Sequence, residues 1–180
     1  RLYRGIDFGY RHPYVVWVRM DAGGDLVVFD EWEGSDATVD ETADAIARVD
    51  RRYGLREQDF AWSGCDPAGA AVGDAGISAV DRLKRRGVKL VWRASEVMTG
   101  VELIKSLLRD AAGRVRLKFS PAAARTIYHL RHYRWEANRD RPSKDDGHDH
   151  AMDALRYLVV NLFGQRSQGW SGAKVMGAKW

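Results

Sequence analysis

Two acidic residues lie at positions where the pattern of the chain predicts buried strands. Asp7 occupies the centre of the segment 5–9, and Asp66 follows the apolar run from Phe60 to Cys65. A buried carboxylate is costly unless a cation compensates its charge. If the two strands are parallel neighbours, both carboxylates lie at one edge of the sheet, where a divalent metal ion would relieve their repulsion. Two simpler roles stay open: Asp66 as a turn residue before a proline, and Asp7 as the cap of a tight turn.

A third set of candidate ligands lies at the start of the last apolar, helix-periodic segment, residues 149–163. Asp149 and Asp153 are four residues apart, and His150 and Asp153 are three apart, so the three side chains share one end of a helix. Carboxylates with one imidazole suit Mg²⁺ or Mn²⁺ better than a structural zinc ion. The helix dipole alone would explain Asp149, but it explains Asp153 less well. Acids on a first strand, a later strand and a late helix together form the arrangement of a two-metal hydrolase.

The basic residues are concentrated in one part of the chain. Lys and Arg number 29 against 25 Asp and Glu, a formal net charge of +4. Residues 104–144 hold 11 of the basic side chains and 3 of the acidic ones, a net charge of +8, which leaves −4 for the rest of the chain. A basic segment of this kind indicates a polyanionic partner. A solvated helix face followed by an arginine-rich loop is the alternative.

The apolar periodicity predicts a mixed α/β sheet covered by helices. Three closely spaced strands open the chain and strands then alternate with helices, an order that favours an antiparallel meander joined to parallel strands. The predicted strands are 3–8, 14–20, 26–32, 60–66, 88–92 and 115–119. The predicted helices are 38–54 with a capping box at Thr38, 77–86, 95–111 with Ser95 as its cap, a short helix from Pro121, and 149–163.

Length and composition fit one globular domain. The chain has 180 residues, of which 45% are apolar and 30% charged, and the single Cys65 excludes an internal disulfide and a cysteine-rich zinc site. This cysteine usage favours a reducing, intracellular setting. No apolar run approaches the roughly 18 residues that a membrane span needs. We expect a domain over residues 1–163 and a flexible tail over 164–180, and the lack of an initial Met indicates a piece of a longer protein.

Three motifs resemble the nuclease domain of the large terminase subunits of bacteriophages, and the resemblance runs from about Tyr3 to Phe163. The motifs are Gly5-Ile6-Asp7-Phe8-Gly9, Cys65-Asp66-Pro67-Ala68-Gly69 and Asp149-His150-Ala151-Met152-Asp153-Ala154-Leu155-Arg156-Tyr157. The last motif is the most specific, whereas the first is shared with many folds. The resemblance implies a ribonuclease H-like fold and a metal-dependent endonuclease that cuts concatemeric viral DNA during genome packaging.

By position, the resemblance implies that Asp7, Asp66 and Asp153 are the catalytic acids, with Asp149 and His150 as further metal ligands. Two Mg²⁺ or Mn²⁺ ions would be bound, with Asp7 bridging them. The implied partners are double-stranded DNA, an ATPase domain of the same longer polypeptide, the small terminase subunit and the portal, and the implied location is the host-cell cytoplasm. The chain holds no G-x-x-x-x-G-K-[ST] motif, which puts motor activity of this part of the protein in doubt.

DNA contacts are expected from the basic segment just before the last helix. The candidate residues are Arg131, Arg134, Arg139, Arg141 and Lys144. Contacts to phosphate carry no sequence information, so we expect weak sequence preference.

Three other functions stay open at this stage. A Holliday-junction resolvase would share the fold and the acids and would cut cruciform DNA selectively. A non-catalytic DNA-binding or motor-docking module would bind no metal, although no expected acid is missing from the chain. A sugar kinase or actin-like ATPase would share the opening Asp-x-Gly turn, but those chains carry a second phosphate-binding turn and are longer.

Overall fold

Six strands form one sheet in the computed structural model of the chain, which describes residues 1–9, 11–72, 76–134 and 147–164. The strands are β1 (Leu2–Asp7), β2 (Tyr14–Met20), β3 (Leu26–Glu33), β4 (Phe60–Cys65), β5 (Leu90–Val91) and β6 (Leu117–Phe119). Their order across the sheet is β5-β4-β1-β2-β3-β6. β1, β2 and β3 pair antiparallel, whereas β4 pairs parallel with β1 and β5, and β6 pairs parallel with β3. The predicted mixed sheet is therefore confirmed.

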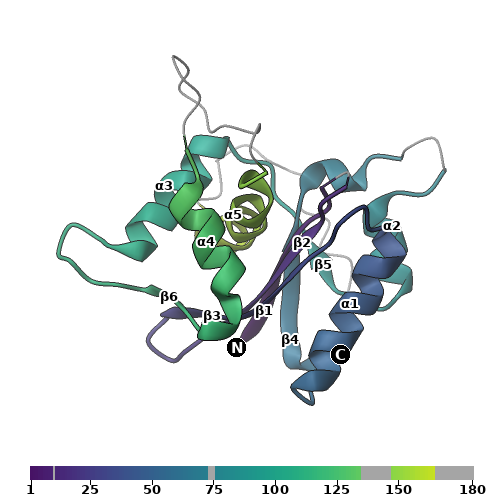
Figure 1. The fold of residues 1–180 in the computed structure, drawn as a ribbon, viewed down its shortest axis with the longest axis horizontal. Coiled ribbons are helices and arrows are strands. Elements are labelled where there is room, and N and C mark those ends of the chain that lie inside the picture. The colour runs from purple at the N-terminus through teal and green to yellow at the C-terminus, as the bar shows by residue number, and fades with distance from the viewer. Residues whose placement is uncertain (10, 73–75, 135–146, 165–180) are drawn as a thin grey trace.

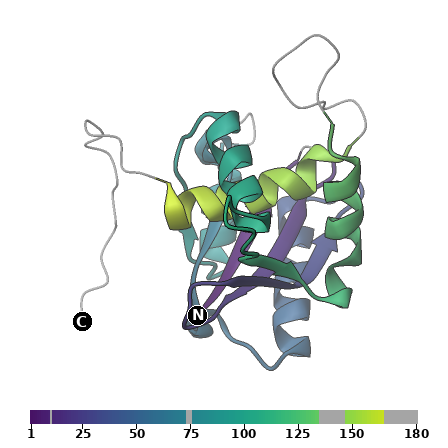
Figure 2. The ribbon, with the colours of Figure 1, turned by 90° about the vertical axis from the view of Figure 1, so that its left-hand side faces the viewer.

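Helices cover both faces of this sheet. The α-helices of the described residues are α1 (Val39–Arg52), α2 (Ala79–Arg85), α3 (Val97–Leu108), α4 (Ala124–His132) and α5 (Asp149–Phe163). Short 3₁₀ turns cover Glu57–Asp59, Pro67–Ala70 and Pro121–Ala123. Figure 1 shows α1 and α2 on one side of the sheet, the α1 face, and α3, α4 and α5 on the other, the α5 face. In Figure 2, α5 crosses over the strands.

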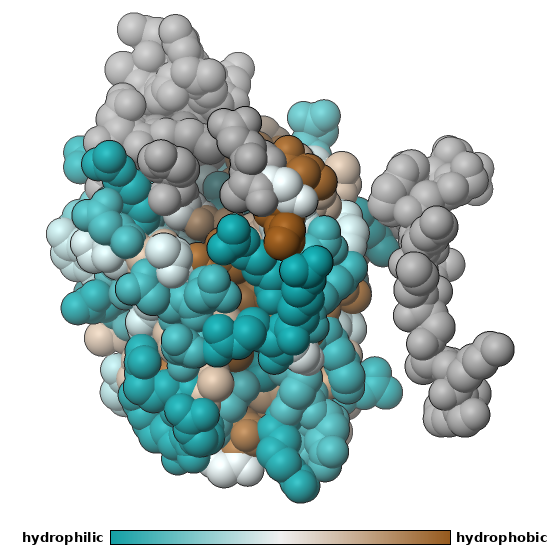
Figure 3. Space-filling view, turned by 90° about the vertical axis from the view of Figure 1, so that its right-hand side faces the viewer, coloured by the Kyte–Doolittle hydropathy of each residue, from teal (hydrophilic) through white to brown (hydrophobic). Residues whose placement is uncertain are grey.

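Strand alternation gives each face of the sheet its own apolar core, because successive side chains point to opposite sides. Ile6, Trp17 and Cys65 belong to the core of the α1 face. Tyr3 and Val16 belong to the core of the α5 face, together with side chains of α3 and α5. On the outside of α1 and α2, hydrophilic side chains cover most of the surface (Figure 3). These two helices therefore follow the ordinary amphipathic pattern, with an apolar stripe toward the sheet.

The structure confirms one predicted helix start and corrects another. The Thr38 hydroxyl accepts from the Glu41 amide at 3.2 Å, and the Glu41 carboxylate accepts from the Thr38 amide at 2.7 Å, which is the predicted capping box. The prediction that Ser95 caps α3 is wrong. The N-cap of α3 is Glu96, and the Ser95 hydroxyl is buried with no hydrogen-bond partner among the described residues.

Other element boundaries shift for identifiable reasons. α3 ends at Leu108 rather than Ala111, because the Asp110 carboxylate accepts from two amides that follow it and forms a turn. The strand expected over 88–92 shortens to β5, which pairs only with β4. The short helix expected from Pro121 continues as α4. A carboxylate from β3 stabilises its first turn, since Glu31 accepts from the Arg125 amide at 2.7 Å.

The last helix ends at Phe163, as its apolar periodicity predicted, and the domain boundary at this residue stays a prediction. Residues 165–180 lie outside the described part of the chain, so the flexible tail stays a prediction. No helix within the described ranges is long and apolar enough to cross a membrane.

Candidate active site

The first two predicted acids lie side by side at one edge of the sheet. Asp7 is the last residue of β1, and Asp66 follows β4 directly. Since Ile6 and Cys65 are register partners on these parallel neighbours, the two strands deliver the next residue of each to the same place. Ile6 and Cys65 pack on the α1 face, so alternation turns Asp7 and Asp66 toward the α5 face.

Two glycines allow α5 to lie directly on these strands. Gly5 of β1 and Gly64 of β4 are register partners. A Cβ at Gly5 would collide with the carbonyl group of Ala154, and a Cβ at Gly64 would lie 2.9 Å from the carbonyl oxygen of Tyr157. Glycine inside a strand often marks such a close approach of a second backbone, which is the sequence signal that could have identified this contact. The contact carries Asp153, the residue before Ala154, to the ends of β1 and β4.

Asp7 is buried and shares a hydrogen bond with His150. The distance from its Oδ2 to Nδ1 of His150 is 2.8 Å, and Asp7 is only 5% exposed. Burial raises the pKa of Asp7, and the neighbouring carboxylates of Asp153 and Asp66 raise that pKa further, against the opposing effect of His150. The hydrogen bond to Asp7 raises the pKa of His150. Gly9 leaves room for the imidazole, because a Cβ there would lie 2.8 Å from its Nδ1.

Asp153 is held by an arginine that the sequence interpretation did not single out. Nε of Arg156 donates to Oδ1 of Asp153 at 2.9 Å, and the side chain of Arg156 is almost fully buried. The two residues are three apart on α5, a spacing that brings side chains together on one helix face. The spacing of Asp153 and Arg156 was visible in the sequence. An acid and a base three residues apart are common on exposed helix surfaces, however, so the spacing gives no indication that this pair is buried.

The remaining two predicted ligands are also placed near these groups. Asp149 is buried at the start of α5, and its Oδ1 lies 4.0 Å from Nε2 of His150. Asp66 is partly buried, and its Oδ1 accepts from the amide of Ala68 at 2.9 Å, so it also forms the turn that its sequence context suggested. The two roles of Asp66 are compatible, because a carboxylate has further lone pairs for another ligand.

The donor set fits a hard divalent cation in its chemistry. The carboxylates of Asp153 and Asp66 lie close enough to Asp7 to raise its pKa, a repulsion that a divalent ion relieves. In the described part of the chain, no three His, Cys, Asp or Glu side chains already surround a common metal position. Asp7 is engaged by His150 and Asp153 by Arg156, so these side chains would exchange those contacts for a cation.

A histidine cluster joins α4 to the start of α5, and sequence reasoning missed it. Nδ1 of His129 lies 2.9 Å from Nδ1 of His148, the residue before α5. The ring of His132 lies 5.4 Å from that of His148, and Nε2 of His129 lies 3.6 Å from Oε1 of Glu33. Burial lowers the pKa of His129. The cluster fixes α4 beside Asp149, so α4 borders the acidic site.

α4 brings two of the predicted DNA-contacting residues to this border. Arg131 is exposed on α4, and Arg134 is exposed two residues after the helix ends. The other three candidates, Arg139, Arg141 and Lys144, lie outside the described residues.

Comparisons with known proteins find a similar fold among solved structures. No family model matches the sequence, and no curated protein matches it. Among solved structures, the P22 large terminase nuclease domain is similar with a TM-score of 0.68 and 16% identity, over 90% of this chain and 81% of that one. The nuclease domain of the large terminase from bacteriophage SPP1, solved with bound Mn, has a TM-score of 0.61 and 16% identity, over 90% of this chain and 86% of that one. The large terminase nuclease from thermophilic phage G20c has a TM-score of 0.55 and 19% identity, over 87% of this chain and 79% of that one. The chain thus has the ribonuclease H-like fold of large terminase nuclease domains, as its motifs predicted.

Proposed function

We propose that this protein is a divalent-metal-dependent endonuclease that hydrolyses phosphodiester bonds of double-stranded DNA. The observation that carries the proposal is the meeting of Asp7, Asp66 and Asp153 at the edge of the sheet beneath α5. A cluster of repelling, partly buried carboxylates destabilises the fold unless it binds a cation. The fold of the three terminase nuclease domains supports the same activity.

Asp7, Asp66 and Asp153 would hold two Mg²⁺ or Mn²⁺ ions, with Asp7 shared between them and Asp149 and His150 as additional ligands. When bound, the ions would supply an activated water and stabilise the leaving 3′-oxygen. The Mn in the SPP1 nuclease domain supports this choice of metal. No side chain is needed as the general base in this scheme.

The residues of the chain orient these groups and bind the substrate. Before a metal ion binds, the hydrogen bond from His150 holds one oxygen of Asp7, and the close packing of α5 on Gly5 and Gly64 fixes the distance from Asp153 to the strand ends. Arg131 and Arg134 would bind DNA phosphates on either side of the cut, together with Arg139, Arg141 and Lys144. Such contacts hold the duplex without reading its sequence.

The likeness to terminase nuclease domains supports a role in packaging viral DNA. In that role the chain would act with an ATPase domain of the same longer polypeptide, and with the small terminase subunit and the portal. It would work on concatemeric DNA in the cytoplasm of the host cell. Residues 1–163 would form the nuclease domain, and 164–180 its flexible tail.

Cutting of supercoiled plasmid tests the proposal directly. We expect cutting with Mg²⁺ or Mn²⁺ and none with EDTA, and we expect Asp7→Asn to reduce the rate by more than about 100-fold, because it removes the shared metal ligand. Asp44→Asn is the matched control, since this exposed acid lies on α1, on the opposite face of the sheet. Undiminished cutting by the Asp7→Asn protein would overturn the assignment.

A further inference from the structure

Arg156 is a buried cation in direct contact with the acidic site. Its guanidinium lies over the ring of Tyr157, 4.4 Å from the ring centroid, and donates to Asp153. Arg156 is only 7% exposed, so its charge is not screened by bulk water. A buried arginine of this kind must be paired, and the carboxylate of Asp153 is the partner at 2.9 Å.

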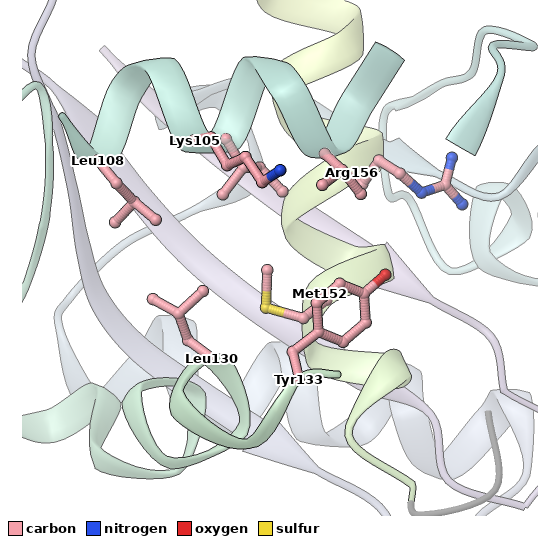
Figure 4. A pocket seen from close by; sticks show the side chains of 8 residues that line it. Lys105, Leu108, Leu130, Tyr133, Met152 and Arg156 are labelled. Atoms are coloured by element: carbon pink, nitrogen blue, oxygen red, sulfur yellow. The ribbon is translucent and has the colours of Figure 1, made fainter. Parts of the chain in front are cut away.

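A contact with α3 fixes where the Arg156 side chain runs. A Cβ at Gly100 of α3 would collide with Cγ of Arg156 and lie 2.7 Å from its Cδ, the atom bonded to Nε. In Figure 4 the stem of Arg156 lines one end of a cavity of about 200 Å³ between α3, α4 and α5, and the guanidinium points away from Leu108 and Leu130. The glycine therefore provides the space that lets Nε reach Asp153.

The positive charge of Arg156 affects how strongly the acidic site binds a metal ion. The carboxylates of Asp153 and Asp66 lie near the buried carboxylate of Asp7, and burial makes the repulsion at Asp7 costly before any ion is bound. Arg156 supplies one positive charge at Asp153 in that state. Once a divalent cation occupies the same carboxylates, the guanidinium becomes a like charge at close range and opposes it.

We propose that Arg156 is a counter-ion residue that stabilises the metal-free site and thereby weakens its affinity for divalent cations. The proposal rests on the proposed function for the identity of the cation site. A second effect acts in the opposite direction, because the hydrogen bond from Nε also orients Asp153. Glutamine at position 156 retains an amide donor without the charge, so Arg156→Gln isolates the effect of charge. A full charge acts more strongly in a buried site than one neutral hydrogen bond.

Calorimetric titration with Mn²⁺ tests this inference without measuring cutting. We expect the Arg156→Gln protein to bind Mn²⁺ roughly tenfold more tightly than wild type, a conservative figure for a buried like charge. The temperature at which the variant unfolds should be lower than that of wild type without metal. The rise of that temperature on adding Mn²⁺ should be larger for the variant than for wild type. Arg156→Lys, which keeps the charge, should bind like wild type. The charge-matched control is Arg86→Gln, at the C-cap residue of α2 on the opposite face of the sheet, and it should leave Mn²⁺ binding unchanged.

A further variant keeps the test decisive. If Arg156→Gln does not fold, Gly100→Ala carries the test, since it displaces the guanidinium from α3 and should also tighten Mn²⁺ binding. Equal or weaker binding by Arg156→Gln would overturn the counter-ion role alone. Absence of Mn²⁺ binding by the wild-type protein would overturn the proposed function.

Discussion

Two buried arginines on opposite faces of the sheet serve opposite purposes. Arg4, in β1, is fully buried on the α1 face. Its guanidinium donates to Asp50 at 2.6 Å, to Glu57 at 2.9 Å and to the hydroxyl of Ser63 at 3.0 Å. Arg156, in α5, donates to the single carboxylate of Asp153. Arg4 thus belongs to a group in which each charge has partners, whereas Arg156 faces a surplus of acids.

The difference separates a structural ion cluster from a site prepared for a ligand. On the α1 face the Asp50 carboxylate also accepts from Nε1 of Trp17 at 2.8 Å, and the Arg4 guanidinium lies 3.5 Å from the centroid of the Phe60 ring. That network is complete as it stands. On the α5 face, burial raises the pKa of Asp7 and the carboxylates of Asp153 and Asp66 add to that effect, in spite of the hydrogen bond to His150. A bound cation would neutralise the excess of carboxylates on the α5 face, whereas the acids around Arg4 on the α1 face are already paired.

Removing Arg4 should give the largest loss of stability. Arg4→Met leaves the buried carboxylate of Asp50 without its main partner, which costs about 3–5 kcal/mol of unfolding free energy. Urea denaturation measures the loss. The control Arg86→Met breaks exposed ion pairs with Asp40 and Asp44, which solvent screens, and it should cost far less. A loss for Arg4→Met no larger than that of the control would show that the α1-face network is dispensable and would remove the contrast between the two arginines.

The next largest effect should come from the glycines under α5. Gly5→Ala places a methyl group against the carbonyl of Ala154, and backbone cannot move aside cheaply, so we expect a loss of about 2–3 kcal/mol. Gly64→Ala, whose nearest contact is 2.9 Å from Tyr157, should cost less. Urea denaturation gives both values.

Mn²⁺ titration of the same two variants connects their packing to the site. If α5 sets the position of Asp153, Gly5→Ala should weaken Mn²⁺ binding together with stability. The control Gly54→Ala has no neighbouring atom within 4 Å but a φ of +66°, and it should cost about 1 kcal/mol without changing Mn²⁺ binding. Normal metal binding by a destabilised Gly5→Ala protein would contradict this account of how the site is held.

Much of the site could be predicted because it follows from local patterns. Alternation in β1 and β4 indicated where Asp7 and Asp66 leave the sheet, and the helical period of α5 indicated that Asp149 and Asp153 share one end. These inferences need only the neighbours of each residue in the sequence. The parallel pairing of β1 and β4, which was only a condition of the metal-site hypothesis, is shown by the structure.

The parts that escaped prediction depend on contacts between distant segments. Glu31 of β3 stabilises the start of α4, an interaction across more than ninety residues that lengthens a helix expected to be short. Gly100 and Arg156 meet because α3 packs on α5, and no local pattern in the sequence indicates that contact. Ser95 has the right residue type for a cap, but the packing of its surroundings leaves its hydroxyl buried at the residue before the N-cap.

The smallest expected effect concerns Cys65, which lies beside Asp66 in the chain but on the opposite face of the sheet. Burial raises the pKa of the Cys65 thiol to about 12 from its ordinary value of 9.0. Because the folded pKa is the higher one, the unfolded chain loses this proton first. The contribution of the thiol to stability is therefore complete below pH 9 and is lost as pH rises toward 12.

Comparing wild type with Cys65→Ala isolates this effect from other groups that titrate in alkali. Between pH 9 and pH 10 we expect the wild-type unfolding free energy to fall relative to the variant by at most about 1.4 kcal/mol. Urea denaturation at the two pH values measures the difference. A parallel pH dependence of the two proteins would mean that the Cys65 thiol ionises in the folded state as easily as in water. Solvent would then reach the α1 face at β4. The α1 face would no longer differ from the α5 face in being fully packed and internally paired at that strand.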